Sequence, residues 1–399
     1  MSAKVPNDQF EVYVFDGVPD SVKSAIEQVR RRAAVCHDLS LRVSDDNPRR
    51  YPAWVFGAVE PSQFIFHDGL DWASFLDTMA ALVLDQLDTS HTAWRLHVFA
   101  SMAGVPAASG PATVVVLQIS HALADGTRAS ALAAWLFGRA DPVPLISAPR
   151  RGSLLLRSVD AARTHRRLAH DIDSGVLPAP GKPRAPVLTN SAPAGVRRVR
   201  TVLRNRRALT GGTVTVSVLV AISSALAGYL AGRGEDSSQL AAEIPMADTG
   251  NRESRNHFRN IGVGLHPELP PAERAVLIAA ALSAGRQRAE HPAAIASRRS
   301  FAAVPAPLLR WGVGKFDAAV RPAAVTGHTV VSSVHRGAAD LRFGAVPVLF
   351  TAGYPALSPM MSLVHGVHGI GDTVAISVHA ADSAGDIDDY VARLERALG

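Results

Sequence analysis

The chain of 399 residues is poor in cysteine, and this shortage limits its chemistry. Its single cysteine, Cys36, cannot form an internal disulfide and offers no Cys-x-x-Cys spacing for a metal or redox centre. One cysteine also suits a reducing compartment, so we expect a cytoplasmic protein without a metal ion or other cofactor. The segment 1–17 has no apolar run behind a basic start, so we expect no secretory signal there.

Two further absences narrow the function classes. The sequence contains no Gly-x-Ser-x-Gly segment, which argues against a serine hydrolase built on a nucleophile elbow. The net charge is +6, but the basic residues gather in one stretch without interleaved aromatic residues or a recognised binding motif. We therefore expect no nucleic-acid partner.

A run of 25 residues, 208–232, has no charged side chain and is long enough to cross a membrane. Gly211 and Gly212 interrupt it early, and three serines dilute its apolar surface. Apolar residues recur in it at helical spacing, for example at Val218, Ile222 and Leu226. We therefore expect a buried core helix over 214–230 and not a membrane span.

The stretch between residues 150 and 207 is strongly basic, with 13 arginines and Lys182 against three aspartates, and it is rich in proline and glycine. Because the chain exceeds the size at which one core stops growing, we expect two subdomains, 1–145 and 197–399, joined by an exposed crossover over 146–196. Such a crossover could meet the phosphates of a CoA, the surface of a membrane or lipid droplet, or solvent alone.

The order of elements mixes hairpins with helical crossovers, which predicts a mixed α/β (α+β) architecture. The apolar patterns predict strands at 10–15, 94–99, 114–120, 197–203, 241–246, 329–333, 347–351, 363–370 and 372–380. They predict helices at 20–34, 72–87, 127–137, 214–230, 271–290 and 387–398.

The candidate reaction centre is the segment HALADG, 121–126, which follows the apolar strand VVVLQIS. His121 would stand at the end of a buried strand, where a rigid scaffold can hold a base, and imidazole titrates near neutral pH. Asp125 could orient the loop. Gly126 tolerates a positive φ and leaves room for a substrate near the backbone.

HALADG resembles the HxxxDG signature of the acyltransferases built like chloramphenicol acetyltransferase. Among these, the bacterial wax ester synthase/diacylglycerol acyltransferase family is the most similar, supported by the stretches LDTSHTAWRL (87–96) and GYPALSP (353–359). That family has two adjacent histidines, and here Ser120 stands in place of the first. The resemblance implies two similar subdomains, an active site in a tunnel at their interface, and His121 as the general base.

The same resemblance implies acyl-CoA as co-substrate and an alcohol acceptor, such as a fatty alcohol or diacylglycerol. It also implies that Asp125 fixes the loop through an ion pair. The donor to the tetrahedral oxyanion is left open among four candidates, Ser217, Asn260, Ser332 and Ser333, and Ser120 could replace a hydrogen bond of the absent histidine.

Two alternatives remain open. The first is a condensation-like transferase that uses a carrier-bound thioester or an amine acceptor. The second is a non-catalytic binding protein of the same fold. A metal enzyme is not favoured, because His365 and His368 lie three residues apart in a strand and should project to opposite faces.

Overall fold

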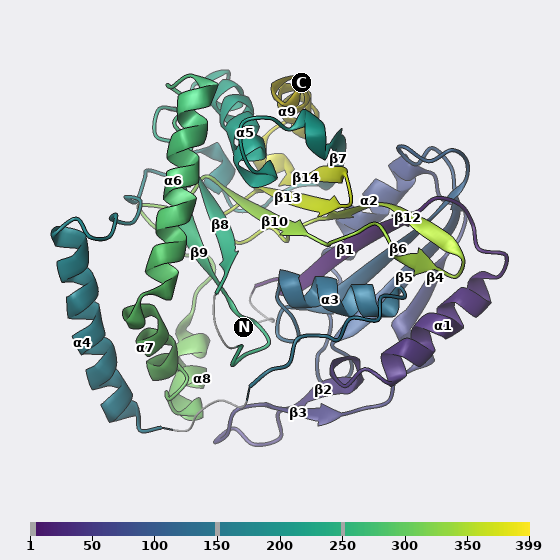
Figure 1. Ribbon diagram of the computed structural model, residues 1–399, viewed down its shortest axis with the longest axis horizontal. Coiled ribbons are helices and arrows are strands. Elements are labelled where there is room, and N and C mark those ends of the chain that lie inside the picture. The colour runs from purple at the N-terminus through teal and green to yellow at the C-terminus, as the bar shows by residue number, and fades with distance from the viewer. Residues whose placement is uncertain (1–4, 148–151, 249–251) are drawn as a thin grey trace.

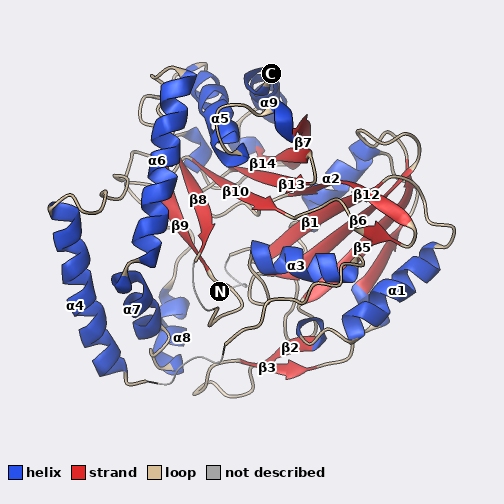
Figure 2. Ribbon diagram, viewed as in Figure 1, coloured by secondary structure: helices blue, strands red, loops and turns tan. Residues whose placement is uncertain are grey.

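Two six-stranded sheets form the centre of the molecule, and helices cover their outer faces (Figures 1 and 2). The computed structural model describes residues 5–147, 152–248 and 252–399. The strand order is β11-β12-β1-β6-β5-β4 in the first sheet and β7-β14-β13-β10-β8-β9 in the second. The expected mixed α/β architecture is confirmed.

The first sheet is antiparallel except where β4 pairs with β5. Helices α1 (Val22–Ala34) and α3 (Gly126–Leu136) pack on one face, and α2 (Trp72–Leu82) packs on the other. Its strands are β1 (Asp8–Phe15), β4 (Phe64–His67), β5 (Trp94–Met102), β6 (Ala112–Ser120), β11 (Arg342–Phe343) and β12 (Val346–Gly353). A hairpin of β2 (Leu41–Ser44) and β3 (Ala53–Phe56) lies outside the sheet.

The second sheet packs one face against α5 (Val214–Ala231), α6 (Pro271–Glu290) and α9 (Ile387–Leu398). Its strands are β7 (Arg197–Asn205), β8 (Ala241–Ala247), β9 (Phe258–Gly264), β10 (Thr329–His335), β13 (Leu363–Ile370) and β14 (Thr373–Ala381). In the described part of the chain, α5 alone has the length and apolarity of a membrane span, and 56% of that window is buried inside the protein. It contributes most of its apolar residues to the core of this half.

Two strands from the second half of the sequence, β11 and β12, belong to the first sheet. Both lie within the segment 197–399. β12 runs antiparallel to β1, with Gly353 opposite Glu11, and the chain then returns to β13 in the second sheet. The boundaries expected at residues 145 and 197 stay a prediction, and β12 ties the two halves together across them.

The basic crossover contains a helix that the apolar pattern did not predict. Helix α4 (Leu154–Asp173) has no buried residue and lies beside α7 (Pro292–Phe301) at the edge of the molecule, with α8 (Ala306–Lys315) nearby (Figure 1). Leu155 and Leu156 on α4 are exposed. Of the basic residues in the crossover, Arg150 and Arg151 lie outside the described residues.

Candidate active site

His121 directly follows β6, every residue of which is buried. Its backbone N–H donates to the Asn7 carbonyl at 2.8 Å, beside the start of β1. Four residues later Asp125 caps α3, since its carboxylate accepts from the Arg128 backbone N–H at 2.9 Å. The loop is thus held at both ends by the strand and the helix that the sequence predicted around it.

A cavity of about 280 Å³ lies between the two sheets, and His121 lines it. Asp125 and Gly126 line it from the first half of the chain, and Asn260, Ser332 and Ser333 line it from the second. The Phe258 ring stands 5.9 Å from the His121 ring, centroid to centroid. Six of the eight residues singled out from the sequence therefore meet around one cavity. Whether that cavity opens on both faces, as a tunnel would, stays a prediction.

The environment of His121 keeps its imidazole neutral. Burial lowers the pKa of His121 to about 4, and the nearby negative charge of Asp125 opposes this only weakly. Nδ1 of the ring is buried and has no hydrogen-bond partner among the described residues. At physiological pH the imidazole is therefore neutral, and one of its two ring nitrogens carries a lone pair, which is the form that a general base requires.

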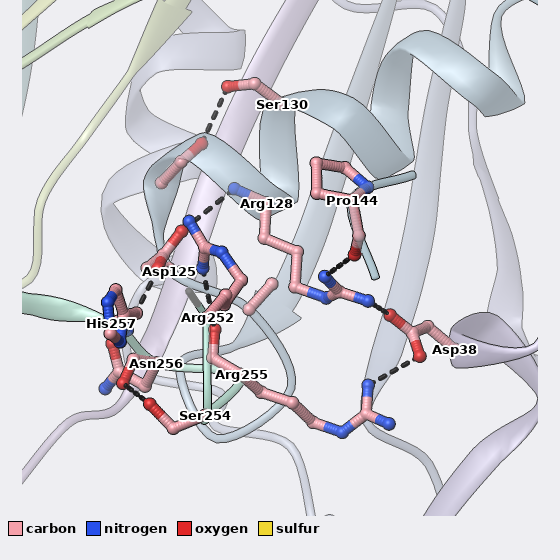
Figure 3. A network of polar contacts seen from close by, with 12 residues as sticks. Asp38, Asp125, Arg128, Ser130, Pro144, Arg252, Ser254, Arg255, Asn256 and His257 are labelled. Atoms are coloured by element: carbon pink, nitrogen blue, oxygen red, sulfur yellow. Dashed lines mark hydrogen bonds and ion pairs between the residues drawn. The ribbon is translucent and has the colours of Figure 1, made fainter. Parts of the chain in front are cut away.

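The carboxylate of Asp125 points into a network that joins the two halves (Figure 3). Besides capping α3, it accepts from the His257 backbone N–H at 2.9 Å and forms an ion pair with Arg252. A second acid in the network, Asp38, pairs with Arg128 and, at 2.6 Å, with Arg255. These contacts fix the segment 252–257 against the histidine loop. The part of Asp125 in catalysis stays a prediction.

Glycine at position 126 is explained by the lack of space for a side chain and not by its backbone conformation. It is the first residue of α3 and is not among the glycines with a positive φ. A Cβ at this position would lie 3.2 Å from Cγ2 of Val334, across the cavity. The close approach of the two walls therefore favours glycine, whereas the positive φ that glycine tolerates is not used.

Two of the candidate polar residues do not line the cavity. The hydroxyl of Ser120 is buried and accepts from Asn7 Nδ2 and from the Ala122 backbone N–H, each at 3.3 Å. The hydroxyl of Ser217 donates to the Thr210 and Thr213 carbonyls at the start of α5. The Ser217 side chain thus bonds only nearby backbone, whereas Ser120 joins its own loop to the Asn7 side chain.

The other three candidates, Asn260, Ser332 and Ser333, differ in the hydrogen bonds that their side chains already make. The Asn260 amide donates to Glu243, and the Ser333 hydroxyl shares a hydrogen bond of 2.8 Å with Thr215. Ser332 lies on the face of β10 that also presents Val330 and Val334 to the cavity. Because alternate residues of a strand share a face, Ser332 is the candidate best placed to reach a bound substrate.

The cavity residues that the sequence analysis missed include Glu11, Arg336, Tyr354 and His368. Glu11 and Arg336 form a buried ion pair across the two halves. Acidic residues in the strand DQFEVYVF were the available signal, since a charge in a buried strand needs a partner. The expected opposite orientation of the two strand histidines is confirmed, because His365 bonds Tyr390 on α9, away from the cavity. The described residues contain no group of three His, Cys, Asp or Glu side chains that could hold a metal.

Two sheets with a histidine loop at their interface define the chloramphenicol acetyltransferase-like fold, as the resemblance implied. A wax ester synthase/diacylglycerol acyltransferase from Marinobacter aquaeolei VT8 matches with a TM-score of 0.62 and 16% identity, over 99% of this chain and 94% of that one. The first condensation domain of the CDA synthetase matches with a TM-score of 0.62 and 15% identity, over 98% and 90%.

A starter condensation domain of the rhizomide synthetase RzmA, in complex with C8-CoA and Leu-SNAC, matches with a TM-score of 0.57 and 16% identity, over 98% and 88%. No family model and no curated protein matches the sequence. At these identities the likeness establishes the fold.

Proposed function

We propose that this protein transfers an acyl group from a thioester, acyl-CoA in the first instance, to the hydroxyl group of an acceptor. The observation on which this rests is His121, neutral at the end of a buried strand and lining a cavity between the two sheets. Solved structures with this fold support it, since their names include a wax ester synthase/diacylglycerol acyltransferase and a condensation domain holding C8-CoA.

In the proposed reaction, Nε2 of His121 takes the proton of the acceptor hydroxyl as its oxygen attacks the thioester carbonyl. The tetrahedral species then collapses, the carbon–sulfur bond breaks, and the thiolate takes the proton back from His121. A positioned base of this kind typically contributes about 10²- to 10⁴-fold, or roughly 3–5 kcal/mol of the barrier. Ser332 is the proposed hydrogen-bond donor to the oxyanion, because its face of β10 lines the cavity.

The test is release of free thiol from acyl-CoAs of several chain lengths, each offered with a fatty alcohol, diacylglycerol, a polar alcohol or an amine. We expect His121→Ala to lower the rate at least about 100-fold. His91→Ala is the matched control, because His91 is an exposed histidine that lies outside the cavity. Equal thiol release by the wild type and His121→Ala with every pair would contradict the proposal.

The same assay separates the alternatives. Release from a carrier-bound thioester but not from any acyl-CoA, or an amide as product, would indicate the condensation-like reaction. Binding of acyl-CoA without turnover would indicate a non-catalytic protein of this fold. Contact of the basic crossover with a membrane or lipid-droplet surface is a separate part of the proposal, supported by the exposed leucines among the arginines of α4.

A further inference from the structure

A second buried imidazole, that of His368, lines the same cavity as His121. His368 lies on β13 opposite Val334 of β10, and it is 6% exposed. Its Nδ1 is buried, and no hydrogen-bond partner for it occurs in the parts of the chain that the structure describes. Buried polar atoms in native proteins are nearly always paired. His368 lines the cavity, so a ligand atom at the exposed edge of its ring could form a hydrogen bond that the described residues do not provide.

The strands around His368 are shaped to hold its ring. A Cβ at Gly353 would lie 2.8 Å from Cε1 of the ring, and a Cβ at Gly366 would lie 2.7 Å from the same atom. Neither glycine has a positive φ, so the backbone conformation does not require glycine there. Glycine within a strand marks a close approach. At Gly353 the nearest atom is that of the imidazole, whereas a Cβ at Gly366 would first meet the Gly353 carbonyl oxygen.

The charges beside His368 determine which ligand group it can bind. Burial and then the positive charge of Arg336 hold the pKa of His368 well below its usual range, so the ring is neutral. Arg336 is itself paired with Glu11 and donates to the Tyr13 hydroxyl at 2.5 Å. A neutral imidazole next to a closed ion pair does not select a carboxylate or a phosphate. It suits a hydroxyl group, which can both donate and accept.

We propose that His368 is a specificity-determining residue that hydrogen-bonds a second substrate hydroxyl, one that is not acylated. This inference rests on the proposed function for the identity of the substrates. It predicts hydroxylated substrates, either diols as acceptors or hydroxyacyl chains as donors, in preference to plain hydrocarbon chains of equal length.

Equilibrium binding tests the inference without relying on turnover. The His121→Ala variant is titrated calorimetrically with 1-decanol against 1,2-decanediol, and with decanoyl-CoA against 3-hydroxydecanoyl-CoA. One neutral hydrogen bond should favour the hydroxylated member by about 3- to 10-fold in one of the two pairs, and the pair that shows it identifies the substrate carrying the group.

Substituting His368 should abolish that preference. We expect a ratio near one in His121→Ala/His368→Leu and a partly retained ratio in His121→Ala/His368→Asn, which keeps a polar group. The matched control is His121→Ala/Ser377→Ala, which also removes a buried polar atom without a hydrogen-bond partner in the described chain. Ser377 does not line the cavity. Circular dichroism and thermal melting confirm that each variant is folded.

The outcomes separate the two proposals. A preference that His368→Leu removes, in a protein that releases no thiol, would support the role of His368 and contradict the acyl transfer. Thiol release that depends on His121, without a preference in either pair, would overturn the role of His368. A preference that survives His368→Leu, or no binding of any of the four probes, would overturn it as well.

Discussion

Asp125 offers the sharpest test of how the histidine loop is held. Its side chain is 4% exposed and accepts from two backbone N–H groups while it pairs with Arg252, which is 14% exposed. Asp125→Ala removes the cap of α3, worth about 1 kcal/mol. It also leaves a largely buried guanidinium without its partner, which typically costs about 3–5 kcal/mol. Together these amount to about 4–6 kcal/mol, which is close to the lower end of the stability of a typical domain, about 5–15 kcal/mol.

Asp125→Asn separates the two contributions, because asparagine caps a helix as well as aspartate does. We expect this variant to keep the start of α3. It should lower the free energy of unfolding by roughly 2–4 kcal/mol, because the charge of Arg252 loses its ion-pair partner. Adding Arg252→Met removes that charge, and the double variant should recover about 1–3 kcal/mol relative to additivity. The matched control is Asp45→Asn, whose exposed ion pair with Arg310 should be worth less than about 1 kcal/mol.

Urea unfolding and the value of kcat/KM for thiol release would be measured on the wild type, on these four variants and on Arg252→Met alone, which the comparison with additivity requires. If Asp125 acts by orienting the loop, activity should follow stability and recover in the double variant. If Asp125 instead acts directly on the imidazole, its loss should lower kcat whether or not Arg252 is present. A stable Asp125→Asn with low kcat that Arg252→Met does not restore would refute the orienting role.

Three further predictions concern the cavity and the surface. Burial lowers the pKa of His121 to about 4, and the neutral ring is the active form, so kcat/KM should stay level from pH 8 to about pH 5 and fall at lower pH. A half-maximal kcat/KM near pH 6.5 would contradict this. Gly126→Ala should raise KM severalfold with little change in melting temperature, since the new methyl group would press on Val334 at 3.2 Å, and unchanged steady-state kinetics would disprove this crowding. The double change Leu155→Ser/Leu156→Ser removes exposed apolar surface but no charge, so it should weaken sedimentation with phosphatidylglycerol and with phosphatidylcholine vesicles. Equal binding by the variant and the wild type would exclude α4 from the lipid contact.

Local patterns predicted most of the secondary structure. The strand 363–370 and the helices 271–290 and 387–398 have the expected bounds. The clearest pattern is in 387–398, whose buried residues Ile387, Tyr390, Leu394 and Leu398 recur at helical spacing. Helix α4 was missed because its segment is strongly basic, which favoured the prediction of an exposed crossover, and the helix buries no residue fully. Strand β2 was also missed, since it has only four residues, whereas β3 overlaps the segment 54–66, which the sequence predicts to be extended.

The residues of the site also differ in whether the sequence alone could identify them. His121 and Asp125 could be found from the sequence because strand, loop and helix are consecutive, so that one segment of about 25 residues contains the whole arrangement. His368 and Arg336 could not, because their place at the cavity depends on how β10 and β13 pair with each other and pack against the first sheet. Residue type alone could not select among the candidate serines. Ser217 and Ser332 were equal candidates from the sequence, but only Ser332 lines the cavity.

The return of β12 to the first sheet explains why the cavity walls stay together. Glu11 on β1 stands opposite Gly353 at the end of β12, and the chain leaves that point to form β13, which holds His368. The ion pair of Glu11 with Arg336 then closes the wall, since Arg336 directly follows β10. β12 anchors the later part of the chain in the first sheet, and the buried charges resist a shift between the sheets, because any shift would separate an acid from its base in a medium of low dielectric constant. The halves that face each other across His121 are therefore joined by both pairing and charge.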